Sequence, residues 1–289
     1  MILVPAHGME NFAEERTVVI PSPRGDIHSV LTCGSGTVRD RKGDRPLVIM
    51  CHGLMMHGGL NPISGISSSF AENGYDTLRM DFRGSGKSGG DIMEMTPLTE
   101  VDDLLAVMMY VAAEPSLSPD GVPRRFVICG HSLGGLVSLL AASVLYGARL
   151  PADVGESEKE MLRGALAGLI LLAPAVNIEE DSRAGRVAYE TFDPVNIPEA
   201  VEVWGSKLSR NYFLTARSLD TFSTISHYRG PACILMGERD RIVEMDLSGR
   251  LLAALPQAEM HMIRHGDHLF SRVSRLRATE IALGFLGTV

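Results

Sequence analysis

The chain is poor in cysteine and in long apolar runs. Its 289 residues include four cysteines, Cys33, Cys51, Cys129 and Cys233, with no close pair and no Cys-x-x-Cys spacing. We interpret them as buried thiols, which predicts a cytoplasmic protein. No apolar stretch reaches the ~20 residues that span a bilayer. Residues 1–5 are apolar but lack the basic region of a signal peptide, so we expect no membrane partner.

An excess of positive charge is also missing. The chain has 27 basic and 35 acidic residues, a net charge of −8, which opposes unspecific binding to nucleic acid and favours solubility. We therefore expect a small-molecule ligand and no nucleic acid. The length suits one α/β domain, so we predict a single domain over residues 1–289, as a monomer or a homodimer.

Apolar runs without alternation recur along the chain and predict parallel strands that are covered on both faces. They are residues 47–51, 77–80, 126–129, 166–172 and 233–236, and helix-length segments stand at 66–72, 98–113, 133–146 and 245–255. Two β-rich runs, 16–21 and 27–32, flank a turn-forming cluster and predict an N-terminal antiparallel hairpin. The alternation predicts an α/β fold with a mostly parallel, doubly wound sheet and ligands at the carboxyl ends of its strands.

The alternation stops at residues 175–229, which contain many prolines and aromatic residues but no apolar strand run. Seven of the 16 aromatic residues fall between positions 189 and 228. They could form the core of a small cap, or they could line a pocket for an acyl group. We expect this segment to be a cap inserted over the active site.

Ser132 is the predicted nucleophile. An apolar run, 126–129, meets Gly130-His131-Ser132-Leu133-Gly134, and an apolar helix follows. Such a turn holds a serine hydroxyl exposed between a strand and a helix, and the glycines prevent collisions. Ser88 stands in a second Gly-x-Ser-x-Gly match, but no helix directly follows that turn, so we interpret it as a glycine-rich loop. A phosphate-binding loop there is excluded, because Asp81 occupies the position of a required glycine.

A nucleophilic serine needs a base and an orienting carboxylate, which in this kind of fold follow in the order Ser, Asp, His. Asp240 comes in the loop after the strand at 233–236, and His268 comes in the loop after the last predicted strand. We predict these two as the partners of Ser132. Glu238 and Asp246 are the rival carboxylates.

Two further histidines lie near His268. His265 is a rival base, and the spacing of His261, His265 and His268 would also fit a metal site. We expect no metal, because His261 belongs to a strand and the other two to its loop, and because no cysteine or second carboxylate completes a coordination shell. No organic cofactor is expected either.

The loop after the strand at 47–51 contains His52-Gly53, which predicts a second donor to an oxyanion. We expect the backbone N–H groups of Leu54 and Leu133 to converge on the substrate carbonyl oxygen. Met55 is expected to line the pocket nearby, although methionine also serves as core filler.

Together these features resemble those of α/β-hydrolase-fold serine hydrolases, from about Arg16 to Phe285. Several stretches are most similar to bacterial cinnamoyl or feruloyl esterases: DFRGSGKSGGD at 81–91, LLAPA at 171–175, FDP at 192–194 and EMHMI at 259–263. The resemblance implies hydrolysis of hydroxycinnamoyl esters, with Asp181 and Tyr212 at positions that contact the phenolic ring. Solvent exposure of Asp181 and cap packing of Tyr212 are the alternatives. Leu133 and Ala188 depart from the family pattern, which leaves phenolic selectivity open.

The expected activity is therefore that of a serine carboxylesterase that works through an acyl-enzyme. A short-chain or lipid esterase, a thioesterase or a small aminopeptidase would use the same chemistry on another substrate. A ligand receptor of the same fold without turnover is an alternative of another class.

Overall fold

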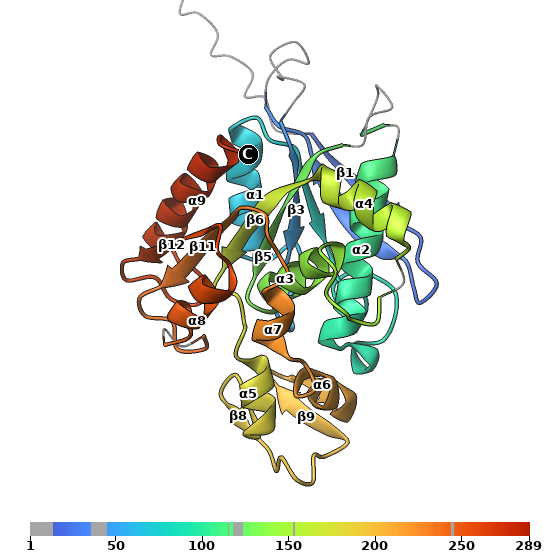
Figure 1. Cartoon of the computed structure of the whole chain (residues 1–289), viewed down its shortest axis with the longest axis vertical. Coiled ribbons are helices and arrows are strands. Elements are labelled where there is room, and N and C mark those ends of the chain that lie inside the picture. The colour runs from blue at the N-terminus through green and yellow to red at the C-terminus, as the bar shows by residue number, and fades with distance from the viewer. Residues whose placement is uncertain (1–13, 36–44, 115, 118–123, 153, 244–245) are drawn as a thin grey trace, which may run out of the picture.

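One eight-stranded sheet forms the centre of the computed structural model, which describes residues 14–35, 45–114, 116–117, 124–152, 154–243 and 246–289. The strand order is β1-β2-β4-β3-β5-β6-β11-β12 (Figure 1). The strands are β1 (Glu15–Ile20), β2 (Ile27–Thr32), β3 (Leu47–Cys51), β4 (Thr77–Met80), β5 (Phe126–His131), β6 (Leu166–Leu172), β11 (Ala232–Gly237) and β12 (Ala258–Ile263). The pairs β1–β2 and β2–β4 are antiparallel and the others are parallel. The predicted doubly wound sheet with an N-terminal hairpin is confirmed.

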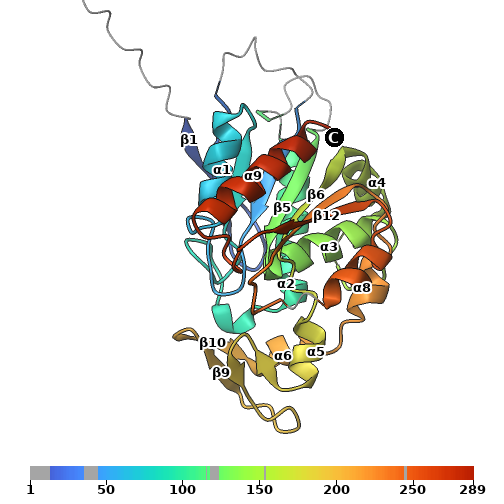
Figure 2. The same cartoon turned by 90° about the vertical axis from the view of Figure 1, so that its left-hand side faces the viewer.

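Helices cover both faces of the sheet, and each face has its own apolar core. On one face lie α1 (Ile63–Glu72) and α9 (Val273–Leu286), which also contact each other (Figure 2). The other face carries α2 (Pro97–Ala113), α3 (Leu133–Leu145), α4 (Glu156–Ala165) and α8 (Leu247–Ala254). Every residue of α3 is buried, which explains why its sequence is apolar all round. This helix begins directly after Ser132.

The predicted strand bounds agree with the structure for β2, β3, β4 and β6. β5 continues two residues beyond the predicted end, to His131, and so leads straight into the turn at Ser132. α1 begins three residues earlier than expected. The start of the helix predicted at 245–255 lies outside the described residues, as do residues 1–5.

Residues 175–229 add no strand to the large sheet. They form α5 (Ile178–Arg183), β7 (Arg186–Val187), β8 (Glu190–Thr191), β9 (Ala200–Val203), β10 (Ser206–Ser209), α6 (Arg210–Ala216) and α7 (Thr221–Ile225). The strands pair as two short antiparallel ribbons, which the lack of apolar runs did not suggest. Figures 1 and 2 show most of this segment projecting beyond one end of the sheet. In the described part of the chain, no helix combines the length and apolar character that crossing a membrane needs.

Candidate active site

The turn between β5 and α3 holds Ser132 in a strained conformation, with φ 54° and ψ −119°. Glycine is needed on both sides because the backbone passes very close to its neighbours. A Cβ on Gly130 would collide with the carbonyl oxygen of Gly134, and one on Gly134 would collide with that of His52. The Ser132 N–H donates to the Leu172 carbonyl at 2.9 Å, which anchors the turn to β6.

His268 connects Ser132 to Asp240. Its Nε2 lies 2.9 Å from Ser132 Oγ, and its Nδ1 lies 2.8 Å from Asp240 Oδ2. With Nδ1 donating to the carboxylate, Nε2 is free to accept the serine hydroxyl proton. The Asp240 side chain is fully buried and that of His268 is 10% exposed. The structure thus brings together the three side chains that the sequence places 28 and 108 residues apart, in loops after β5, β11 and β12.

The electrostatics of Asp240 favour its charged form. Burial on its own would raise the pKa of this carboxyl, but the hydrogen bond and the charge of His268 lower it below its usual value. The backbone N–H groups of Ile242 and Val243 also donate to Oδ1, at 2.8 and 3.0 Å. Asp240 therefore stays ionised opposite the imidazole.

The rival residues Glu238 and Ser88 have other partners. Glu238 accepts from the His265 N–H at 2.7 Å, and both side chains are more than half exposed. Asp246 stands at the start of α8. Ser88 Oγ donates to the Asp81 carbonyl at 2.6 Å and accepts from the His28 N–H at 2.8 Å, so it holds a loop together.

A cavity opens above Ser132. Leu54 and Leu133 line it from the sheet side, and Asp181, Ala188 and Tyr212 line it from the 175–229 segment. Asn177, Arg186, Trp204 and Ile242 are also among its lining residues. Met55 is not; its half-buried side chain packs against the larger apolar core.

The polar end of this cavity is a connected network. Asp181 accepts from Asn177 Nδ2 at 2.7 Å and pairs with Arg186 at 2.6 Å. Asn177 Nδ2 also donates to the Ile242 carbonyl at 2.9 Å, so it links α5 to the loop that holds Asp240. The Asp181 side chain is only 20% exposed, so this carboxylate is held by partners and does not lie free in solvent.

The aromatic residues of the 175–229 segment form a small core and also line the cavity. Phe192 and Phe213 pack with their ring centroids 4.3 Å apart, which forms a small core. Tyr212 packs against Phe213 at 5.2 Å and also lines the cavity. Burial, followed by the charges of Glu100 and Asp181, raises the pKa of Tyr212, so its phenol remains a hydrogen-bond donor.

Two buried histidines that we did not single out from the sequence fix the loops of the site. His131 Nε2 donates to the His268 carbonyl at 2.8 Å; burial and the neighbouring His268 lower the pKa of His131 to about 3. His52 Nε2 accepts from the Phe82 N–H at 3.0 Å, and burial lowers its pKa to about 4. Both imidazoles are therefore neutral at ordinary pH. Their only sequence signal is their place inside the His-Gly and Gly-His-Ser motifs.

Glu100 in α2 is a buried carboxyl close enough to influence Tyr212, and its Oε2 has no hydrogen-bond partner within the described chain. Burial and the nearby Asp103 raise the pKa of Glu100 well above 4.5. The folded state therefore holds this proton more tightly than the unfolded state does. The protein is most stable at pH values below the pKa that Glu100 has in the unfolded state. The free energy of unfolding decreases as the pH rises from there toward the pKa that Glu100 has in the folded state.

We expect Glu100→Gln to stabilise the protein at pH 7.5 and to have little effect near pH 4.5. The wild type should lose about 1.4 kcal/mol per pH unit relative to this variant within the window between the two pKa values, since one proton is involved. Urea unfolding at several pH values measures the difference. Glu160→Gln, at an exposed position of α4, is the control and should show a constant offset. A pH-independent offset for Glu100→Gln would contradict the assignment.

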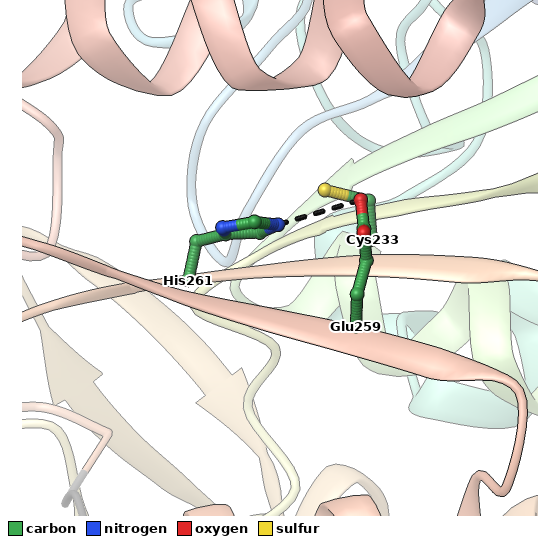
Figure 3. A group of neighbouring side chains, drawn as sticks. All are labelled: Cys233, Glu259 and His261. Carbon is green, nitrogen blue, oxygen red and sulfur yellow. Dashed lines mark ion pairs between the residues drawn. The ribbon is translucent and has the colours of Figure 1, made fainter. Parts of the chain in front are cut away.

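The arrangement of the remaining histidines corrects part of the argument against a metal. His265 and His268 belong to the contacts described above, whereas His261 lies beside Glu259 and Cys233 (Figure 3). A cysteine and one carboxylate thus lie beside His261, which the argument from spacing did not take into account, whereas His265 and His268 do not belong to this group. The sequence did not show this neighbourhood because it depends on the pairing of β11 with β12.

Residues 43–211, more than half of the chain, match the Hydrolase_4 family, described as serine aminopeptidase, S33. The chain belongs to the Hydrolase_4 family. The solved structure of Est1E from Butyrivibrio proteoclasticus with bound ferulic acid is similar to this Hydrolase_4 protein, with a TM-score of 0.76 and 25% identity. The similarity covers 93% of this chain and 98% of Est1E.

Two curated proteins match shorter parts of this Hydrolase_4 chain. A monoacylglycerol lipase from Mycolicibacterium smegmatis is 28% identical over 138 residues, 47% of this chain and 40% of the lipase. An uncharacterized 31.7 kDa protein from Escherichia coli is 30% identical over 91 residues, 31% of this chain and 30% of that protein. The matched stretches thus span less than half of either relative. Together the comparisons confirm an α/β hydrolase of the esterase or lipase type that resembles feruloyl esterases.

Proposed function

We propose that the protein is a serine carboxylesterase that hydrolyses hydroxycinnamoyl esters through an acyl-enzyme. The observation that carries this proposal is the hydrogen-bonded chain from Ser132 through His268 to Asp240, beneath a cavity with apolar walls and one polar end. The substrate is a small-molecule ester. The four free cysteines support a cytoplasmic location.

Ser132 Oγ attacks the ester carbonyl carbon while His268 Nε2 takes its proton. The tetrahedral intermediate collapses, the ester C–O bond breaks, and His268 returns the proton to the leaving alcohol. His268 then takes a proton from a water molecule, whose oxygen attacks the acyl-enzyme carbonyl carbon. The second tetrahedral intermediate collapses, the bond to Ser132 Oγ breaks, His268 returns the proton to Oγ, and the carboxylic acid leaves. Asp240 keeps Nδ1 protonated and stabilises the imidazolium at each step.

Backbone donors from Leu54 and Leu133 would stabilise the negative oxygen of the intermediate. Both residues line the cavity beside Ser132. Leu133 is the first residue of α3, so its N–H belongs to the helix-terminal donors that have no partner inside the helix. Such preorganised donors typically contribute about 3 kcal/mol each to transition-state stabilisation.

Residues 175–229 form the cap in this proposal, as an insertion within one domain of 1–289. Asp181 and Tyr212 stand at its polar end and would bind the phenolic hydroxyl of the acyl group. Asp181 is preorganised by Asn177 and Arg186, and Tyr212 keeps its O–H proton. The departures at Leu133 and Ala188 remove neither of these two side chains from the cavity wall.

We expect Tyr212→Phe to lower kcat/KM for methyl ferulate about tenfold, because a hydrogen bond to the phenolic oxygen contributes roughly 1.5 kcal/mol. Methyl cinnamate lacks that hydroxyl and is the matched control substrate, so its kcat/KM should stay within about twofold of the wild-type value. Steady-state rates on both esters measure the difference. An equal loss on both substrates would show that Tyr212 acts only through cap packing.

A lipid or short-chain esterase is the second candidate, favoured by the similarity to a monoacylglycerol lipase. A panel of methyl ferulate, p-nitrophenyl butyrate, a monoacylglycerol and an aminoacyl amide separates the candidates by kcat/KM. We expect the highest value for methyl ferulate. A higher value for the monoacylglycerol would make the cap cavity an acyl-chain site, and turnover of the amide alone would indicate a peptidase.

A further inference from the structure

Cys233, Glu259 and His261 form a cluster away from Ser132, on the two strands at the edge of the sheet. Cys233 lies on β11 and pairs in register with Glu259 on β12, and Leu235 pairs with His261. Since side chains alternate along a strand, all three point to the same face of the sheet. Figure 3 shows the imidazole and the carboxylate turned toward each other, with the thiol behind them. One ligand atom from each residue lies within 4.8 Å of the others.

The distance between His261 and Glu259 suits two ligands of one metal ion. His261 Nε2 is buried and has no hydrogen-bond partner among the described residues. It lies 3.4 Å from Glu259 Oε1. Two ligand atoms at about 2.05 Å from a tetrahedral ion are about 3.3 Å apart, so this spacing matches one edge of such a site. A buried nitrogen without a partner is costly, and a metal ion would supply that partner.

An ion can reach the cluster from solvent. Glu259 and His261 line an open hollow of about 490 Å³ that also contacts Ile281, Gly284 and Phe285 of α9. The Glu259 side chain is 54% exposed and that of His261 is 37% exposed, whereas Cys233 is fully buried. The cluster is therefore buried at its thiol end and open at its carboxylate end.

We propose that Cys233, Glu259 and His261 bind a divalent transition-metal ion and that they prefer Zn²⁺ to other such ions. A thiolate with an imidazole selects Zn²⁺ over Mg²⁺ or Ca²⁺, which prefer oxygen ligands alone. Three protein ligands leave a fourth position for water. Coordination breaks the S–H bond of Cys233 and releases that proton to solvent, while His261 binds as neutral imidazole through Nε2.

The ion would act on structure and not on the ester reaction. It would hold β11 to the edge strand β12, and the loops after these strands carry Asp240 and His268. Asp240 stands seven positions after Cys233, and His268 stands seven positions after His261. A clamp between the two strands therefore limits the relative movement of the acid and the base.

Metal binding to the purified full chain tests this proposal. After treatment with EDTA and its removal, Zn²⁺ is titrated in competition with a chromophoric chelator, and Co²⁺ serves as an absorbing probe. We expect one Zn²⁺ per chain, a sulfur-to-cobalt charge-transfer band in the near ultraviolet, and a higher Tm with Zn²⁺ than with EDTA. Cys233→Ala and His261→Ala should each lower the Zn²⁺ affinity by about 100-fold or more.

The matched controls remove a cysteine and a histidine outside the cluster. Cys33→Ala and His265→Ala should keep the wild-type Zn²⁺ affinity, since Cys33 is a separate free thiol and His265 pairs with Glu238. His261→Ala changes a partly exposed side chain at the sheet edge, so it tests the site if the buried Cys233→Ala variant fails to fold. Failure of wild-type protein to compete with the chelator overturns the proposal. So does a cobalt band that persists in His261→Ala with unchanged affinity.

Discussion

Replacing Ser132 with alanine should lower kcat on the best ester substrate by about 10⁶, because the variant lacks the oxygen that forms the acyl-enzyme. The geometry supports a loss of this size, since Ser132 Oγ lies 2.9 Å from the accepting nitrogen of His268 at the floor of the cavity. Burst kinetics with an activated ester measures the result, since the variant should release no rapid equivalent of alcohol.

The three side chains should also act as one unit. His268→Ala is expected to lower kcat about as much as Ser132→Ala, and the double variant should be no slower than either. Ser88→Ala is the control, because it removes a serine from the rival glycine-rich motif. Its hydroxyl makes two loop hydrogen bonds, so we expect lower stability but a kcat within about tenfold of wild type. Independent, multiplying losses in the double variant would refute a shared mechanism.

Asp240→Asn should lower kcat by about 10⁴ while leaving KM nearly unchanged. Asparagine can still accept from the backbone N–H groups of Ile242 and Val243, so the loop should keep its shape. An amide does not carry the negative charge that holds the proton on His268 Nδ1 and stabilises the imidazolium.

The same substitution should change the pH dependence of stability. The pKa of Asp240 is lower in the folded state than in the unfolded state. The ionised Asp240 side chain therefore stabilises the fold at pH values above the ordinary aspartate pKa, and this stabilisation is lost as the pH falls through the pKa of the folded state. Asp240→Asn should therefore be less stable than wild type at pH 7, and the difference should shrink in acid. Glu238→Gln, the exposed rival carboxylate, is the control for kcat, and Glu160→Gln, at an exposed position of α4, is the control for stability. A large kcat loss in Glu238→Gln would move the role to Glu238.

The sequence predicts the central strands well because buried parallel strands are nearly continuous apolar runs, as in β3 and β6. It also predicts Ser132, Asp240 and His268, because the carboxyl ends of parallel strands meet at one edge of the sheet. The sequence does not predict the ribbons β7–β8 and β9–β10, because their strands are only two to four residues long and their pairing depends on turns and packing.

Long-range contacts are the other part that the sequence does not reveal. The bond from His131 to the His268 carbonyl joins residues 137 positions apart, and no local pattern specifies it. The cluster at Cys233 depends on the register that sets it opposite Glu259. A slip of one residue would turn either partner to the other face of the sheet. Residues that are far apart along the chain therefore lie together in the fold, and their spacing in the sequence does not reveal these contacts.

The strained backbone at Ser132 has a consequence for how such a protein can change over time. A serine with φ 54° is held in a conformation that costs about 1–3 kcal/mol and that glycine would adopt without the penalty. At this one position, selection for activity and selection for stability oppose each other. A descendant released from the need for turnover would gain stability by losing its nucleophile. In such a lineage, replacement of Ser132 by glycine would be favoured because it increases the stability of the fold, and the loss of catalysis would follow from that gain.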